Sequence, residues 1–183
     1  MNNVIERKAV LTKLLMAAAA VVGAVALPQI FHLIGVVSGT GASVGAALLP
    51  MHIPVLLAGF LGGPVVGAVA GVLSPILSFL LTGMPLASIV PLMAIELGVY
   101  GLTAGLLRKA EMNSFIKLLI VQLAGRFARA AATLAAVYIL GSVQLTVASA
   151  WEFVTAGLYG MLIQWALIPY LTEKLSGAKK LHE

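Results

Sequence analysis

The chain contains no cysteine and very little charge. Only 9% of its 183 residues are Asp, Glu, Lys or Arg, whereas 61% are hydrophobic. The lack of cysteine excludes disulfide bonds and thiolate chemistry. The lack of charge argues against a soluble globular domain, in which roughly a quarter of the residues are charged so that the surface is solvated. With a mean hydropathy of +1.10, the chain is predicted to be an integral membrane protein surrounded by lipid.

Several catalytic and nucleotide-binding patterns are absent as well. The chain has no G-x-x-x-x-G-K-[ST] loop, so it does not hydrolyse a nucleotide by that route. It has no H-E-x-x-H sequence and no paired intramembrane carboxylates, so an enzyme is not expected. His32 and His52 lie near predicted helix ends without a third ligand, so neither a metal site nor a cofactor is predicted. Energy for any transport must come from a gradient or from another subunit.

Long apolar segments predict an all-α membrane protein that forms one membrane domain over residues 1–183. A membrane-spanning helix needs about 20 mostly apolar residues. The hydrophobic runs and the Gly/Pro breaks between them predict six helices, of which the second is short. Their expected ranges are 10–37, 52–61, 64–81, 86–107, 115–140 and 151–171.

The basic residues predict the orientation of these helices. They fall into three groups that six crossings place on one side of the membrane: Arg7, Lys8 and Lys13; Arg108, Lys109 and Lys117; and Lys174, Lys179 and Lys180. The loops expected on the other side, about 36–50, 82–86 and 141–149, contain no Lys or Arg. Because basic residues collect in cytoplasmic loops, both termini are predicted to be cytoplasmic and the protein to be multi-pass. The net charge of +5 is therefore interpreted as a topology signal, and nucleic-acid binding is not expected.

An alternative for the N-terminus is a cleaved signal peptide. The basic start, the apolar run and Ala24-Val-Ala26 resemble an A-x-A cleavage site. Cleavage would leave five helices and place the basic loops on conflicting sides, so the uncleaved helix is the favoured interpretation.

Small residues recur at helical spacing along several of the predicted helices. Gly59, Gly63, Gly67 and Gly71 are four residues apart across the second and third helices, a pattern typical of close helix packing. The first helix carries a similar face, and we expect it to be the docking surface for a separate membrane subunit: Ala17, Ala20 and Ala24.

Ionisable residues occur deep inside two of the predicted helices. Arg126 lies about 17 Å into the fifth helix from the cytoplasmic side, and Glu96 lies about 15 Å into the fourth from the outer side, at about 1.5 Å per residue. In a hydrocarbon core about 30 Å thick these depths nearly coincide, so a Glu96–Arg126 ion pair is predicted. Gln122, Arg126, Arg129 and Thr133 share one face of the fifth helix.

Two interpretations of these polar residues remain open. They can pair only with each other and hold the bundle together. Alternatively, two arginines against one glutamate leave a positive centre that binds an anion, and a carboxylate suits the planar guanidinium group. The predicted substrate site is composed of Glu96, Tyr100, Arg126, Arg129, Tyr159 and His52. Glu152 is expected at the outer rim, and Gln164 is expected to form an interhelical hydrogen bond.

The order of several short motifs resembles the substrate-binding S components of energy-coupling factor (ECF) vitamin transporters. The resemblance covers about residues 10–172. The stretches that carry it are Met51-His-Ile-Pro-Val-Leu-Leu-Ala-Gly59, Gly63-Pro64, Ser74-Pro75, Leu81-Thr-Gly-Met-Pro85, Glu96-Leu-Gly-Val-Tyr-Gly101, Gly125-Arg126 and Gln164 through Pro169.

This resemblance implies a high-affinity vitamin-binding subunit in the cell membrane. Its implied partners are a vitamin, an energy-coupling transmembrane subunit and two ATPase subunits, and the small face of the first helix matches the family's docking surface. The arginines favour an acid such as pantothenate or nicotinate, and pantothenate is the hypothesis. Two other classes remain open: a non-transport membrane scaffold, and a gradient-driven transporter that uses Glu96 as a proton carrier.

Overall fold

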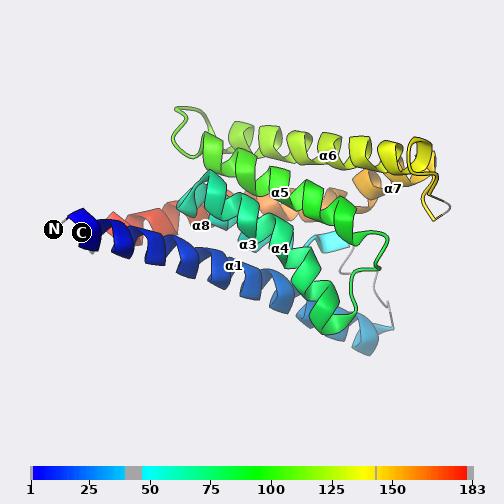
Figure 1. The fold of residues 1–183 in the computed structure, drawn as a ribbon, viewed down its shortest axis with the longest axis horizontal. Helices are drawn as coiled ribbons and strands as arrows, with labels where there is room; N and C mark the ends of the chain where they lie inside the picture. Colours follow the sequence, from blue (N-terminus) through cyan, green and yellow to red (C-terminus); the bar gives the residue numbers. More distant parts are fainter. Residues whose placement is uncertain (1, 40–46, 143, 181–183) are drawn as a thin grey trace.

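A computed structural model describes residues 2–39, 47–142 and 144–180, and the elements in these ranges are helical (Figure 1). The helices are α1 (Asn2–Ser38), α3 (His52–Leu57), η1 (Ala58–Gly62), α4 (Pro64–Thr82), α5 (Val90–Leu107), α6 (Ser114–Tyr138), α7 (Val147–Ala156) and α8 (Leu158–Lys180). The all-α class is therefore confirmed for the described residues. Both termini and the connection between α5 and α6 lie at the same end of the bundle (Figure 1).

Four of these helices are long and apolar enough to cross a membrane. They are α1 from Glu6 onwards, α4, α5 and α6, while α3 and η1 together form a shorter apolar segment, His52–Gly62. The chain is a multi-pass membrane protein on this basis, and the count of six crossings stays a prediction.

The helix boundaries differ from the expected ones at three places. The single helix expected over 151–171 is two helices, α7 and α8, which meet at Gly157. The helix expected from Leu86 begins at Val90, because residues 87–89 form a turn that precedes it. Helix α1 begins at Asn2 and continues through Pro28 without a break.

Helices α4 and α5 approach each other at backbone distance, and the spaced glycines make this possible. A Cβ atom added at Gly67 would lie 2.7 Å from the carbonyl carbon of Gly101 and 2.7 Å from the Cα of Gly59. Gly71 and Gly105 meet the backbone of the facing segment in the same way. The glycine ridge therefore packs helices within the chain, as expected for small residues in membrane bundles.

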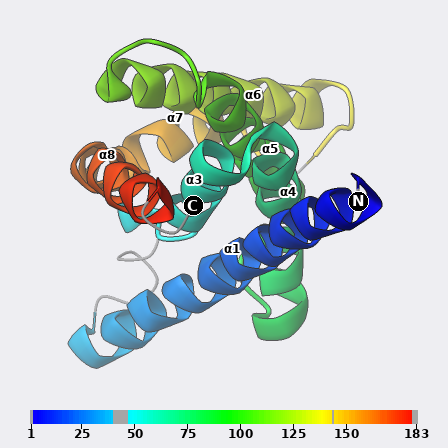
Figure 2. The ribbon, with the colours of Figure 1, turned by 90° about the vertical axis from the view of Figure 1, so that its left-hand side faces the viewer.

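The small face of α1 is directed into the bundle, and its assignment as a docking surface for a separate subunit stays a prediction. Ala24 is fully buried and packs with residues of α3 and α5, whereas Ala20 is buried against η1 and α4. Ala17 is half-buried and packs against the same cluster as Ala20. The physical reason is that small residues allow close approach to any neighbouring helix, including one from the same chain. Figure 2 shows α1 running obliquely across one face of the other helices.

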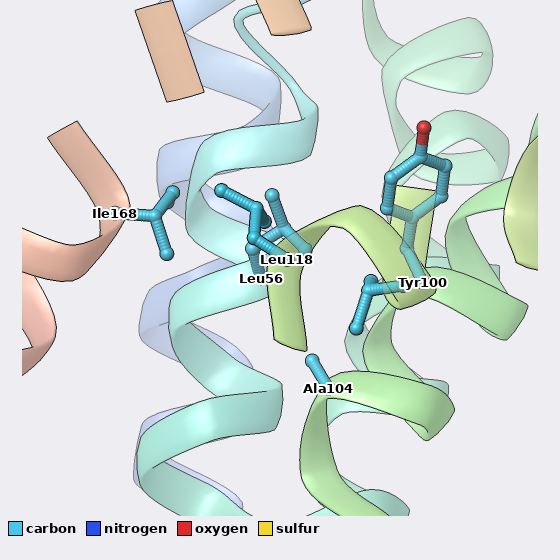
Figure 3. Close-up of a cluster of buried hydrophobic side chains, with 6 residues drawn as sticks. Leu56, Tyr100, Ala104, Leu118 and Ile168 are labelled. Carbon is cyan, nitrogen blue, oxygen red and sulfur yellow. The ribbon is translucent and has the colours of Figure 1, made fainter. Parts of the chain in front are cut away.

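A second apolar core joins α3, α5, α6 and α8. Leu56, Leu118 and Ile168 come from three of these helices and lie close together, with Ala104 and Tyr100 of α5 beside them (Figure 3). All of these side chains are at most 2% exposed. This core links the segments that carry the buried polar residues described next.

Candidate functional site

Three buried charged side chains from two helices meet at one point. Glu96 of α5 forms an ion pair with Arg126 at 3.1 Å (Nη1–Oε1) and accepts a hydrogen bond from Arg129 at 2.5 Å (Nη1–Oε2). Glu96 is fully buried, and the two arginines are only 7% and 6% exposed. The predicted Glu96–Arg126 pair is confirmed, and Arg129 binds the same carboxylate through its other oxygen.

The spacing of the two arginines on α6 explains this arrangement. Arg126 and Arg129 are three residues apart, so they lie on one helix face about one turn apart. The whole polar face is buried: Gln122, Arg126, Arg129 and Thr133. The hydroxyl of Thr133 donates to the carbonyl oxygen of Arg129 at 2.9 Å, which satisfies that hydroxyl within its own helix.

Two aromatic side chains complete the cluster. His52, at the start of α3, is 1% exposed and its Nε2 lies 3.7 Å from Oε1 of Glu96. Its ring meets the ring of Tyr100 edge-on, with 5.1 Å between the centroids and 89° between the planes. The structure thus brings together five of the six residues predicted for the substrate site. We call Glu96, Arg126, Arg129, His52 and Tyr100 the charged cluster.

Tyr159 is the predicted site residue that the structure does not bring to this cluster. Its side chain on α8 is 69% exposed. The prediction treated residues 151–171 as a single helix, but α7 ends at Ala156 and α8 begins at Leu158. Glu152 is exposed, as expected for a residue at the rim.

A second polar group lies beside the charged cluster on α6 and α8. Gln122 donates from Nε2 to Oε1 of Gln164 at 3.1 Å, which confirms the expected interhelical hydrogen bond of Gln164. Trp165 donates from Nε1 to Oε1 of Gln122 at 2.6 Å. The role of Trp165 was missed because a tryptophan in an apolar helix shows no pattern that distinguishes a hydrogen-bond donor from a core residue.

Two glycines shape the walls of the charged cluster, and sequence reasoning did not assign this role to them. A Cβ at Gly125 would overlap the ring of Tyr100. A Cβ at Gly157 would overlap Nη2 of Arg126 and lie 2.7 Å from Leu49. Gly157 therefore both separates α7 from α8 and leaves room for the guanidinium group. Its position at the start of a Gly-Leu-Tyr-Gly stretch was the only signal in the sequence.

The charges of the cluster favour recognition of an anion. Two guanidinium groups face one carboxylate, so the three side chains carry an excess of positive charge. Placing a charge at membrane depth costs at least about 2.5–3.5 kcal/mol on insertion scales, so each buried charge favours an oppositely charged neighbour. A carboxylate ligand would balance that charge through charge-assisted hydrogen bonds. Within the described ranges, no three His, Asp or Glu side chains gather closely enough to hold a metal ion.

Comparison with known proteins identifies a family for nearly the whole chain. The family described as "ECF transporter, substrate-specific component" matches residues 7–178. Neither the curated proteins nor the solved structures contain a significant match to the chain.

Proposed function

The chain belongs to the family of substrate-specific components of ECF transporters, and on this premise we propose that it is the high-affinity binding subunit of an ATP-driven uptake system for a water-soluble vitamin. Membership makes the chain a transport subunit and not an enzyme, and it implies a small-molecule substrate and association with energy-coupling components. The proposed partners are one energy-coupling transmembrane subunit and two ATPase subunits, and the proposed location is the cell membrane.

The excess positive charge of the charged cluster is the observation that carries the proposed substrate class. Arg126 and Arg129 both bind Glu96, and a substrate carboxylate adjacent to them would offset the net positive charge of these three side chains. His52 lies beside the same carboxylate and its ring contacts that of Tyr100, so the two side chains supply polar groups for hydroxyls or an amide. These features fit an acid of the pantothenate type, which combines a carboxylate with hydroxyls and an amide.

The first test identifies the molecule that the protein carries. Small molecules released by denaturing the purified, detergent-solubilised protein are analysed by mass spectrometry, before and after incubation with a vitamin panel. We expect one acidic vitamin at near-stoichiometric yield. A neutral vitamin would refute the anionic substrate while leaving the family assignment intact. No bound vitamin under any condition would refute the proposed binding function.

The second test separates the role of the arginines in recognising a substrate carboxylate from their role in folding. We expect pantothenate to bind at least roughly 10-fold more tightly than its neutral alcohol analogue, because a hydrogen bond to a charged group contributes about 1.5–3 kcal/mol. Arg129→Gln should abolish this preference, whereas Arg7→Gln, which removes an exposed cation from α1, should leave it unchanged. Equal binding of acid and alcohol by the wild-type protein would contradict the proposal.

The proposed contact with the energy-coupling subunit is assigned to the exposed face of α1. Ala20 and Ala24 are occupied by this chain's own helices, whereas Ala18, Ala19 and Val22 are exposed beside them. A bulky side chain, Ala19→Trp, should reduce co-purification with the energy-coupling components without changing vitamin binding. Unchanged co-purification would exclude this face.

A gradient-driven transporter that acts alone is the alternative mechanism. It would require Glu96 to carry a proton, and protonation would remove the carboxylate charge that both ion pairs use. Vitamin uptake by cells that lack the ATPase subunits would support this alternative, and loss of that uptake with Glu96→Gln would identify the carrier. Dependence on the ATPase subunits would exclude it.

A further inference from the structure

A pocket lies at the end of the bundle that holds both chain termini, away from the charged cluster. Its volume is about 320 Å³ and it lies between η1, the end of α5, the start of α6 and α8. Its lining residues come from all four segments: Phe60, Leu61, Arg108, Ser114, Lys117, Ile168, Pro169, Thr172 and Glu173. Phe60 and Ile168 also pack in the core shown in Figure 3, whose other members include Tyr100 of the charged cluster.

The polar residues of the pocket carry a net positive charge, which favours an anion with a single negative charge. Arg108 and Lys117 supply two cations, and Glu173 supplies one carboxylate. Nζ of Lys117 donates to the carbonyl oxygen of Arg108 at 3.5 Å, which holds the two basic residues together. Helix α6 begins at Ser114, and the amide groups of a first helical turn also favour an anion.

The position of Arg108 depends on a backbone feature of the neighbouring turn. Gly63 has a φ of +98°, a conformation that L side chains rarely adopt. A Cβ at Gly63 would lie 2.8 Å from Nη1 and 3.2 Å from Cζ of Arg108. The guanidinium group therefore rests directly over the turn between η1 and α4. This placement orients a long, otherwise exposed side chain along the pocket.

The apolar part of the pocket distinguishes a lipid from a soluble anion. The lining includes four apolar residues: Phe60, Leu61, Ile168 and Pro169. The first turn of α6 next to the pocket exposes further apolar surface, with Phe115 at 53%. A soluble phosphate would gain nothing from these side chains, whereas a phospholipid has both a charged headgroup and apolar chains. The basic clusters of the sequence predict that this end faces the cytoplasm, where anionic lipids are enriched.

From these observations we propose that the pocket binds the headgroup of an anionic phospholipid, with Arg108 and Lys117 at its phosphate and the acyl chains along Phe60, Leu61 and Ile168. Basic pockets between transmembrane helices on the cytoplasmic side recognise lipid headgroups in this way. The lipid would connect η1 to α6 and α8, the segments that line the pocket.

The test compares lipid retention by native mass spectrometry of the full chain released from detergent micelles. Micelles contain phosphatidylglycerol or phosphatidylcholine with identical acyl chains. We expect the wild-type protein to retain phosphatidylglycerol preferentially. The double variant Arg108→Gln/Lys117→Gln should reduce that retention by roughly 25-fold, about fivefold for each cation. The matched control Lys13→Gln/Lys109→Gln removes two exposed cations outside the pocket and should retain the lipid as the wild type does.

Three outcomes would overturn the proposal. Equal loss in the two double variants would show that net charge alone retains the lipid. Displacement of phosphatidylglycerol by inorganic phosphate at micromolar concentration would identify a site for a free anion. Unchanged lipid retention by the Arg108→Gln/Lys117→Gln variant would refute the lipid site, and lost co-purification of the energy-coupling components in that variant would assign the pocket to a protein contact. Circular dichroism of each variant checks that retention is compared between folded proteins.

Discussion

The close packing of α4 against α5 predicts a large destabilisation from adding a single methyl group. In Gly67→Ala, the new Cβ would lie 2.7 Å from two backbone atoms, the carbonyl carbon of Gly101 and the Cα of Gly59. The carbonyl oxygen of Gly101 would lie closer still, and an ordinary contact begins at 3.4 Å, so the facing segments must separate by more than about 0.7 Å. A gap of about 0.5–1 Å forfeits a quarter to a half of the dispersion energy of each affected contact.

The size of the destabilisation follows from the fact that the new Cβ would meet backbone atoms. Overpacking typically costs about 1–3 kcal/mol, and the upper end applies here because backbone atoms cannot rotate away as a side chain does. For a chain of 150–250 residues, about 1 kcal/mol lowers Tm by roughly 2–4 °C, so Gly67→Ala should lower it by about 6–12 °C. Thermal unfolding in detergent, followed by circular dichroism of the helical signal, measures this shift.

The matched control is Gly23→Ala in α1. Its Cβ would lie 3.4 Å from Cγ of Pro54, an ordinary contact, and Ala is favoured over Gly in a helix by about 1 kcal/mol. Its Tm should be unchanged or higher. Equal Tm values for the Gly67→Ala and wild-type proteins would refute the inference that backbone contact between α4 and α5 limits the substitution.

Three further predictions concern the buried polar residues. Glu96→Gln removes the carboxylate charge that both arginines bind. Because breaking a buried ion pair costs about 3–5 kcal/mol, this variant should lower Tm strongly. Glu96→Asp keeps the charge and should lower Tm less. Gly157→Ala should displace the guanidinium of Arg126 and weaken substrate binding measured by calorimetry; unchanged affinity would contradict it. Trp165→Phe removes the donor to Gln122, and the expected loss of about 1 kcal/mol, near 2–4 °C in Tm, would be refuted by an unchanged unfolding curve.

The sequence predicted the helices and the pairing of the buried charges well, because these depend on local patterns. Apolar runs located α4 and α6 to within one or two residues. Counting residues along the predicted helices placed Glu96 and Arg126 at similar depths, and their ion pair has the expected partners. Depth requires only the rise of a helix and the thickness of the bilayer.

The features that depend on which helices pack against each other were predicted less well. The small face of α1 suggested a partner subunit, whereas Ala20 and Ala24 pack within the chain. Residue spacing shows that a helix face consists of small residues, but it does not show which helix packs against that face. Tyr159 was assigned to the cluster by extending one helix through Gly157, where the chain begins a new helix. The position of Trp165 beside Gln122 required the packing of α6 on α8, which no local pattern contains.

The rigid position of Glu96 has a consequence for selectivity among anionic substrates. Its helix is held against α4 backbone to backbone, so the carboxylate is a fixed internal anion, whereas the two arginines reach it through long side chains. A carboxylate substrate that engages these arginines would enter in competition with a residue of the protein itself. Such an exchange lowers the affinity for every anion, and it favours those whose remaining groups contribute contacts that a glutamate side chain lacks. Glu96 would then act as an internal competitor, and a substrate would bind only if its contacts with the protein exceed those that Glu96 makes with the two arginines.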